Sequence, residues 1–214
     1  RLGLVMLLDQ HIVSRVIDRL EADPDVRLAV NISARSARCD PWWREILARL
    51  RGAPEVARRL TVEITETAAM PDMSSAVRFV DGVKRLGVRV ALDDFGVGFT
   101  SIRQIMALKP DVVKIDGFFT READLSGRGR ELFSNLVRLT ASFGATVVVE
   151  GVETQSQAEL ALEAGVHWQQ GYYWARPAVS QNWVSSAEQL QTHVVDVQAY
   201  LPANGQPAAR RVRQ

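Results

Sequence analysis

The chain has 214 residues, of which 47% are hydrophobic and 24% are charged, and its 26 lysines and arginines nearly balance its 25 aspartates and glutamates. This balance argues against binding along a nucleic-acid polymer, and no apolar run is long enough to form a membrane segment. The single cysteine, Cys39, cannot form an internal disulfide, which fits a reducing compartment.

The chain opens with a predicted helix, in which Ile12, Val13, Val16, Ile17 and Leu20 recur at helical spacing. Short segments rich in β-branched residues then alternate with further segments of helical spacing. These predicted strands are Arg27–Ser33, Leu60–Thr65, Val88–Asp93, Asp111–Asp116, Thr146–Glu150 and His167–Trp174. Two helices have candidate N-caps, which are Asp40 followed by Pro41, and Thr100 or Ser101. The alternation predicts an α/β fold with a mainly parallel sheet.

Two architectures fit this alternation, a closed (β/α) barrel and an open doubly wound sheet. Almost every predicted strand carries an acid or an amide near its C-terminal end, and in a closed barrel all of these ends meet at one rim. The polar residues therefore favour a TIM-like barrel. Such a barrel has about eight strands, more than the sequence shows, so we expect two further strands to precede Arg1 and the barrel to be incomplete at its N-terminus.

The carboxylates near these strand ends form the candidate site. Like charges about 4 Å apart cost roughly 4 kcal/mol at an effective dielectric near 20, so such a cluster needs bound cations or raised pKa values. Oxygen ligands suit Mg²⁺, Mn²⁺ or Ca²⁺, and Zn²⁺ fits less well because no histidine or cysteine lies at the rim. Paired hard ions beside such a rim are used in phosphodiester hydrolysis. The carboxylates are Glu63, Glu66, Asp93, Asp94, Asp116, Glu150 and Glu153, with Lys114 as the obvious cation among them.

Several short motifs resemble those of the EAL domain family, in the family's order and at similar spacing. They are Val30-Asn31-Ile32-Ser33, Val62-Glu63-Ile64-Thr65-Glu66-Thr67, Asp93-Asp94-Phe95-Gly96, Val113-Lys114-Ile115-Asp116, Val149-Glu150-Gly151-Val152-Glu153-Thr154 and Gln170-Gly171-Tyr172. The resemblance runs from Arg1 to about Ala178. It implies a TIM-like barrel of the EAL type. It also implies hydrolysis of the bacterial messenger cyclic di-GMP to linear pGpG with two Mg²⁺ or Mn²⁺ ions, with Ca²⁺ inhibitory.

The resemblance further implies roles for individual residues. Lys114 would position water, Glu150 would be the general base, and Glu153 would be a supporting carboxylate. Glu66 would brace the loop after Asp94. The metal ligands would be Asn31, Glu63, Asp93, Asp94 and Glu150, supported by Asp116. Gln170 would belong to the catalytic residues by helping to position the ligand and water. The ligand-binding residues would be Gln170, Arg176 and Pro177.

Two departures from the family pattern leave the activity open. The glutamate of the Glu-Ala-Leu signature has no counterpart in this chain, and the loop after Asp94 has Val97 and Phe99 where the family usually has threonine or alanine and then tyrosine. The sequence therefore admits either a phosphodiesterase or a receptor that binds cyclic di-GMP without cleaving it. A third hypothesis is an unrelated barrel enzyme acting on a small phosphate. We expect the chain by itself to be inactive.

The predicted organisation is an EAL domain without its N-terminal strands over residues 1–185, then a C-terminal helix and a disordered basic tail over residues 186–214. The tail carries Arg210, Arg211 and Arg213 without any acid after Asp196. The expected partners are cyclic di-GMP and either a second copy in a homodimer or another protein. The expected location is the bacterial cytoplasm, with any membrane tether upstream of Arg1.

Overall fold

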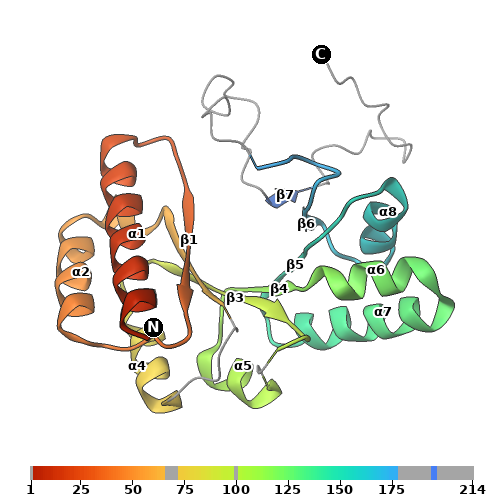
Figure 1. The fold of residues 1–214 in the computed structure, drawn as a ribbon, viewed down its shortest axis with the longest axis horizontal. Coiled ribbons are helices and arrows are strands. Elements are labelled where there is room, and N and C mark those ends of the chain that lie inside the picture. The colour runs from red at the N-terminus through yellow and green to blue at the C-terminus, as the bar shows by residue number, and fades with distance from the viewer. Residues whose placement is uncertain (1, 66–71, 99–100, 178–193, 197–214) are drawn as a thin grey trace. The chain divides into compact units, whose positions relative to one another are not determined.

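A computed structural model describes residues 2–65, 72–98, 101–177 and 194–196 (Figure 1). Helices and strands alternate along the chain, as the sequence predicted. The chain divides into two compact units: the first comprises residues 1–116 and 138–147, and the second comprises residues 117–137 and 148–214. Within the described ranges, no helix is both long and apolar enough to cross a membrane.

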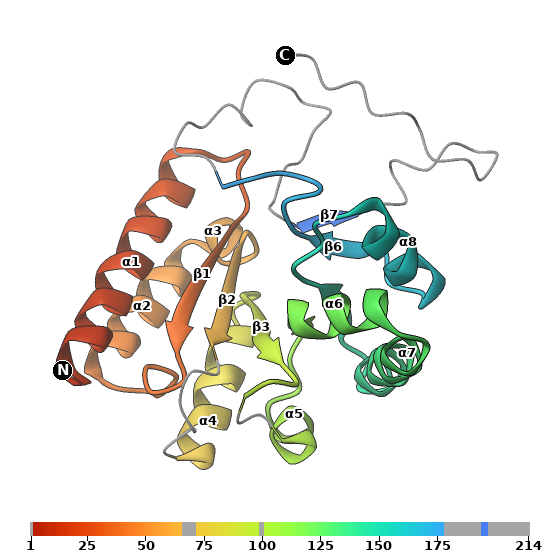
Figure 2. The same ribbon diagram turned by 45° about the vertical axis from the view of Figure 1, so that its right-hand side comes forward.

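The sheet of the first unit is built from β1 (Leu28–Ser33), β2 (Leu60–Thr65), β3 (Arg89–Phe95) and β4 (Val112–Ile115). Consecutive strands pair in parallel, and β1, β2 and β3 are seen side by side in Figure 2. The register aligns Asn31 of β1 with Glu63 of β2, and Glu63 with Ala91 of β3. Because strands in register point matching side chains to one face, Asn31 and Glu63 lie on the same side of the sheet.

Strand β5 (Thr146–Val149) begins in the first unit and ends in the second. The backbone N–H of Thr146 donates to the carbonyl of Asp111, just before β4, at 2.9 Å. This bond sets the start of β5 next to the start of β4 within the first unit.

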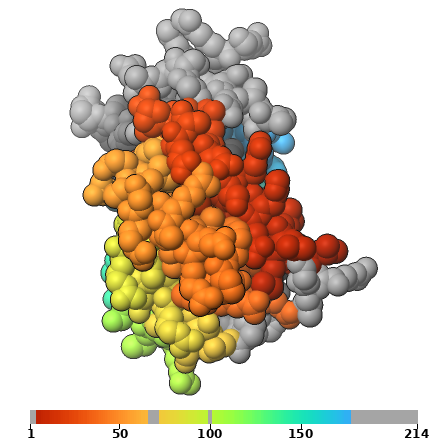
Figure 3. All heavy atoms as spheres, turned by 90° about the vertical axis from the view of Figure 1, so that its left-hand side faces the viewer, coloured from red at the N-terminus to blue at the C-terminus, as the bar shows by residue number. Residues whose placement is uncertain are grey.

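The helices of the first unit are α1 (Leu2–Ala22), α2 (Pro41–Gly52), α3 (Pro54–Ala57), α4 (Met73–Lys84) and α5 (Ile102–Leu108). From the apolar stripe predicted in α1, Val13, Ile17 and Leu20 are buried, whereas Ile12 is exposed. Arg49 of α2 pairs with Asp18 and Glu21 of α1 on the surface of these two helices. Figure 3 shows this face, with α1 in red next to α2 in orange.

Two predicted N-caps are confirmed. Asp40 accepts a hydrogen bond from the N–H of Trp43 at 2.9 Å, with Pro41 at the first position of α2. Ser101 begins α5 in a capping box with Gln104. Both caps satisfy backbone donors that the first turn of a helix leaves without partners.

The second unit contains α6 (Gly117–Leu125), α8 (Gln155–Glu163), β6 (Trp168–Gln170) and β7 (Val194–Asp196). It also holds most of α7 (Gly127–Ala141), whose end from Arg138 onward belongs to the first unit. The end of β5 pairs in parallel with β6, and β6 pairs with β7 in the antiparallel direction. Helices α6 and α8 are joined by a hydrogen bond from the hydroxyl of Ser156 to Asp124.

Two details of the second unit differ from the sequence-based expectation. The last predicted strand extended to Trp174, but β6 ends at Gln170 and a turn follows. The reason is the backbone of Val152, which donates to the carbonyl of Gln170 and accepts from the N–H of Tyr173. Strand β7 was not predicted. It lies within residues 186–214, whose other residues are outside the described ranges, so the predicted helix and tail stay predictions.

Candidate metal centre

Lys114 lies between two carboxylates from neighbouring strands of the first unit. Its Nζ is 3.0 Å from Oε2 of Glu63 on β2 and 2.8 Å from Oδ1 of Asp93 on β3. The side chains of Lys114, Glu63 and Asp93 are only 5%, 13% and 11% exposed. A buried charge is costly unless it is paired, so the loss of any one of these three groups would leave a buried charge without its partner.

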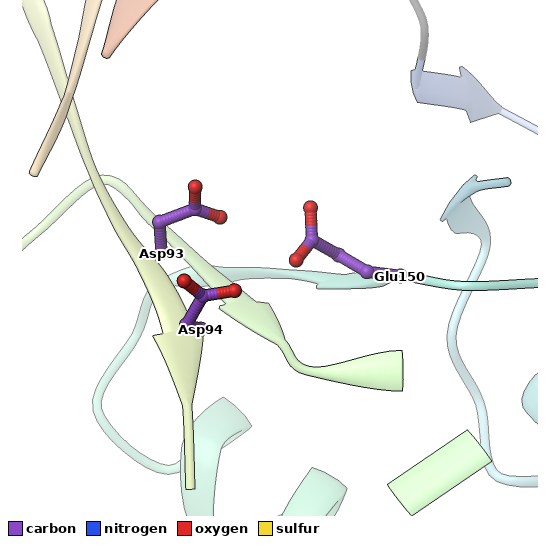
Figure 4. A group of neighbouring side chains, drawn as sticks. All are labelled: Asp93, Asp94 and Glu150. Atoms are coloured by element: carbon purple, nitrogen blue, oxygen red, sulfur yellow. The ribbon is translucent and has the colours of Figure 1, made fainter. Parts of the chain in front are cut away.

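Asp93 and Asp94 are adjacent in β3, yet both carboxylates are presented on one side of the strand end (Figure 4). In a regular strand, neighbouring side chains would point to opposite faces. The pairing of β3 with β4 shifts register between Leu92 and Phe95, and Asp94 has a left-handed backbone with φ 56°. The reorientation starts at Asp94 itself, since aspartate tolerates this conformation better than most residues.

Without a bound cation, the surroundings of Asp94 raise the pKa of its carboxyl above the ordinary value. Burial is the largest cause that raises the pKa of Asp94, followed by the negative charges of Asp93 and Asp116. A hydrogen bond with Asp116 also raises it, whereas Lys114 lowers it. A bound cation would reverse this balance, because it stabilises the ionised carboxylates.

These residues fit a hard divalent cation. The available ligand atoms are carboxylate oxygens, which Mg²⁺ and Mn²⁺ prefer. Oδ1 of Asp93 is buried and accepts no hydrogen bond from the described residues, although Lys114 Nζ approaches it to 2.8 Å without hydrogen-bond geometry. A carboxylate oxygen that accepts no hydrogen bond retains a lone pair that can coordinate a metal ion. Asn31, exposed on β1 and in register with Glu63, could supply an amide oxygen on the same face.

Glu150 follows β5 in the second unit, where it is half-buried. Its backbone carbonyl accepts a hydrogen bond from the hydroxyl of Thr120 at 2.9 Å. Figure 4 labels the carboxylates that the metal-binding hypothesis combines, Asp93 and Asp94 of the first unit and Glu150 of the second.

The remaining predicted residues have diverse surroundings. The N–H of Glu153 donates to the side-chain oxygen of Gln157 at 2.8 Å, just before α8. Gln170 is the last residue of β6. The guanidinium of Arg176 lies over the ring of Tyr172, 4.8 Å from its centre. Pro177 is the last residue described before the gap, and Glu66 lies outside the described residues.

Sequence reasoning missed two residues that support this site. Nothing in the sequence near Thr120 indicates that its hydroxyl reaches the Glu150 carbonyl, because the hydrogen bond joins segments 30 positions apart. Asp9 of α1 is buried and accepts hydrogen bonds from the N–H of Ser33 and the hydroxyl of Ser36, at 3.0 and 2.6 Å. Asp9 thereby fixes the turn that follows Asn31 on β1.

The profile of the EAL domain family matches residues 1–177. Among curated proteins, the chain is 29% identical over 188 residues to the cyclic di-GMP phosphodiesterase PdeL of Escherichia coli. This alignment covers 86% of the present chain and 52% of PdeL. The chain therefore spans about half the length of this relative.

Solved EAL structures superimpose well on the chain. The PaMucR phosphodiesterase in complex with c-di-GMP matches with a TM-score of 0.72 and 26% identity, over 85% of this chain and 75% of that one. The Bacillus subtilis YkuI protein, with an EAL domain and in complex with substrate c-di-GMP and calcium, matches with a TM-score of 0.65 and 26% identity, over 80% and 42%. These matches confirm the predicted α/β, TIM-barrel-like fold.

Proposed function

Because the chain belongs to the EAL domain family, we propose that it binds cyclic di-GMP with two divalent cations and that the full-length protein hydrolyses this dinucleotide to linear pGpG. The relative PdeL is named for this activity, and the PaMucR and YkuI structures are complexes with c-di-GMP. The observation that carries the proposal is the buried triplet of Glu63, Asp93 and Lys114 next to Asp94, whose pKa is raised. The family match leaves no room for the third hypothesis, an unrelated barrel enzyme.

The proposed cation ligands are those that the resemblance to the family indicates. They are Asn31, Glu63, Asp93, Asp94 and Glu150, with Asp116 in support. Bound Mg²⁺ or Mn²⁺ would supply positive charge that polarises the phosphodiester and stabilises the transition state. Ca²⁺, which accepts looser geometry, would hold the ligand and inhibit turnover.

Two side chains would handle water and protons in this proposal. The ammonium of Lys114 can donate to a water oxygen and orient it toward phosphorus, while Glu63 and Asp93 keep it charged. Glu150 would accept a proton as the water oxygen bonds to phosphorus. The bond from phosphorus to the 3′ oxygen then breaks, and that oxygen leaves as a hydroxyl after it takes a proton from solvent water. Glu153 and Glu66 would hold the surrounding loops.

Ligand binding would involve the end of β6 and the turn after it. Gln170 would donate an amide hydrogen bond to the ligand or to water. The guanidinium of Arg176 stacks on the ring of Tyr172, and this contact would orient it toward a phosphate or a guanine base. Pro177 would add an apolar contact.

The test is to incubate the full-length protein with cyclic di-GMP and Mn²⁺ and to follow pGpG by chromatography. Turnover that EDTA abolishes supports the proposal. Binding by calorimetry without any pGpG would instead establish the receptor function. That second function is favoured by Val97, which is exposed in the turn after Asp94 and offers no hydroxyl.

We also propose that the loop after β3 and the following helix α5 contact a second copy in a homodimer, or another protein. Val97, Ile102 and Met106 are apolar and exposed there, and exposed apolar side chains often mark a surface for another protein. Because cyclic di-GMP is a messenger inside bacteria, the proposed location of the domain is the cytoplasm.

A further inference from the structure

The backbone of Glu150 is held by a buried hydroxyl. Thr120 lies in the first turn of α6 and is 1% exposed. Its Oγ1 donates to the carbonyl oxygen of Glu150 at 2.9 Å. A threonine in a helix commonly bonds a carbonyl in its own preceding turn, but this one reaches a different segment. The bond ties the start of α6 to the residue that follows β5, within the second unit.

Two glycines let α6 approach that segment closely. A Cβ atom on Gly151 would lie 2.8 Å from Cα of Gly117, and one on Gly117 would lie 3.0 Å from Cα of Gly151. Gly151 also has φ +62°, a left-handed conformation that side chains disfavour. The two backbones therefore touch directly beside the Thr120 hydrogen bond.

The same segment is also hydrogen-bonded to the end of β6 and to the turn that follows it. The N–H of Val152 donates to the carbonyl of Gln170 at 3.1 Å, and the carbonyl of Val152 accepts from the N–H of Tyr173 at 2.9 Å. Residues 150–152 are thus clamped between α6 and the turn after β6. Such a clamp leaves the Glu150 backbone little freedom, so it fixes the point and the direction in which the Cα–Cβ bond of Glu150 leaves the chain.

We propose that Thr120 is a positioning residue for Glu150, and that its hydroxyl sets the angle at which the Glu150 carboxylate is offered to a divalent cation and to water. This inference rests on the proposed function, because Glu150 matters chemically only if the site holds cations. Partners that orient a metal ligand typically affect metal affinity or activity by about 10–100-fold. A small rotation at the Glu150 carbonyl would be amplified at the carboxylate, which lies several bonds away.

The test compares Thr120→Val, which removes the hydroxyl at nearly constant size, with Thr120→Ser, which retains it. A third variant, Phe133→Leu, opens a gap in the buried part of α7 in the same unit and lowers stability while it keeps the Thr120 hydroxyl. Each variant is made in the full-length protein, and its melting temperature, Mn²⁺ affinity by calorimetry, and kcat and KM for cyclic di-GMP are measured.

We expect Thr120→Val to lower kcat and weaken Mn²⁺ binding by about tenfold each, with KM changed less than twofold. Thr120→Ser should stay within about threefold of the wild type, and Phe133→Leu should lose melting temperature but keep Mn²⁺ affinity. The inference is overturned if Thr120→Val binds Mn²⁺ like the wild type, or if Phe133→Leu weakens Mn²⁺ binding equally. Should the wild type lack turnover, the proposed hydrolysis fails, while the Mn²⁺ affinities still decide the role of Thr120.

Discussion

Nζ of Lys114 lies 2.8 Å from Oδ1 of Asp93, and the same ammonium reaches Glu63 on the other side. One cation therefore balances two nearly buried carboxylates across three neighbouring strands. This arrangement makes the stability of the fold depend on the same groups that we assign to cation binding.

Replacing Lys114 with methionine should destabilise the metal-free protein by about 3–5 kcal/mol, because two carboxylates would be left buried without a counter-ion. Urea unfolding in EDTA measures the loss. The matched control is Lys84→Met, which breaks the Lys84–Asp111 pair, whose side chains are 30% and 32% exposed. Its loss should be nearer about 1 kcal/mol. Equal losses in the two variants would show that the nearly buried Lys114 ion pairs contribute no more stability than the more exposed Lys84–Asp111 pair. Mn²⁺ should restore part of the Lys114→Met loss.

The raised pKa of Asp94 predicts a pH effect on stability without metal. A carboxyl that binds its proton more tightly in the folded state stabilises the fold at low pH, and this contribution is lost as the pH rises from about 4 through the folded pKa. Asp94→Asn has no such group, so in EDTA it should lose less stability than the wild type over this range. The measurement is the urea midpoint of both proteins at several pH values. Parallel curves for the two proteins would contradict the assignment.

Gly171→Ala should disrupt the second unit, because its Cβ would lie 2.1 Å from the carbonyl oxygen of Val152. That contact requires the backbone to move, and we expect a loss of roughly 2 kcal/mol or more together with weaker ligand binding through Gln170. The control is Gly127→Ala at the start of α7, where a Cβ meets nothing within 4 Å. Thermal unfolding should leave Gly127→Ala unchanged or slightly stabilised. A normal melting temperature for Gly171→Ala would refute the prediction.

Arg59 is a second stability determinant, remote from the candidate metal centre. Its guanidinium donates to the carbonyls of Leu20, Asp23 and Val26 at 2.6, 2.6 and 2.9 Å, and so completes the end of α1. Arg59→Met should cost about 2–4 kcal/mol by leaving these carbonyls without partners. Arg58→Met is the control, because Arg58 pairs with Glu55 while their side chains are 61% and 81% exposed, and its effect should be within about 0.5 kcal/mol. Urea unfolding compares the two.

Periodicity and motif order sufficed to predict the elements that build the fold. The alternation of β-branched runs with helical stripes located β1 to β6, and Asp40 and Ser101 marked helix starts, because these signals lie within a few neighbouring residues. The end of β6 at Gln170 was missed because it depends on Val152, which is far away in the sequence. Strand β7 pairs with β6 across a long intervening segment, so local patterns gave no sign of it.

The grouping of acids with Lys114 could be predicted from the sequence, but the geometry of these residues could not. Acids at strand ends indicated a cation site, and Lys114 was identified as the cation among them. The sequence did not show that Asp94 would adopt a left-handed backbone, since that follows from the shifted pairing of β3 with β4. The hydrogen bonds of Thr120 and Asp9 also join distant segments, and a single sequence records no such pairing.

The central claim is that Asp93 and Asp94 hold divalent cations beside a phosphodiester. Its most direct test is anomalous diffraction from crystals of the full-length protein grown with cyclic di-GMP and soaked in Mn²⁺, with Asp93→Asn as the control. We predict manganese peaks at about 2.0–2.3 Å from the carboxylate oxygens of Asp93 and Asp94, which disappear or weaken in the variant. Ordered cyclic di-GMP without any manganese at these carboxylates would contradict the claim.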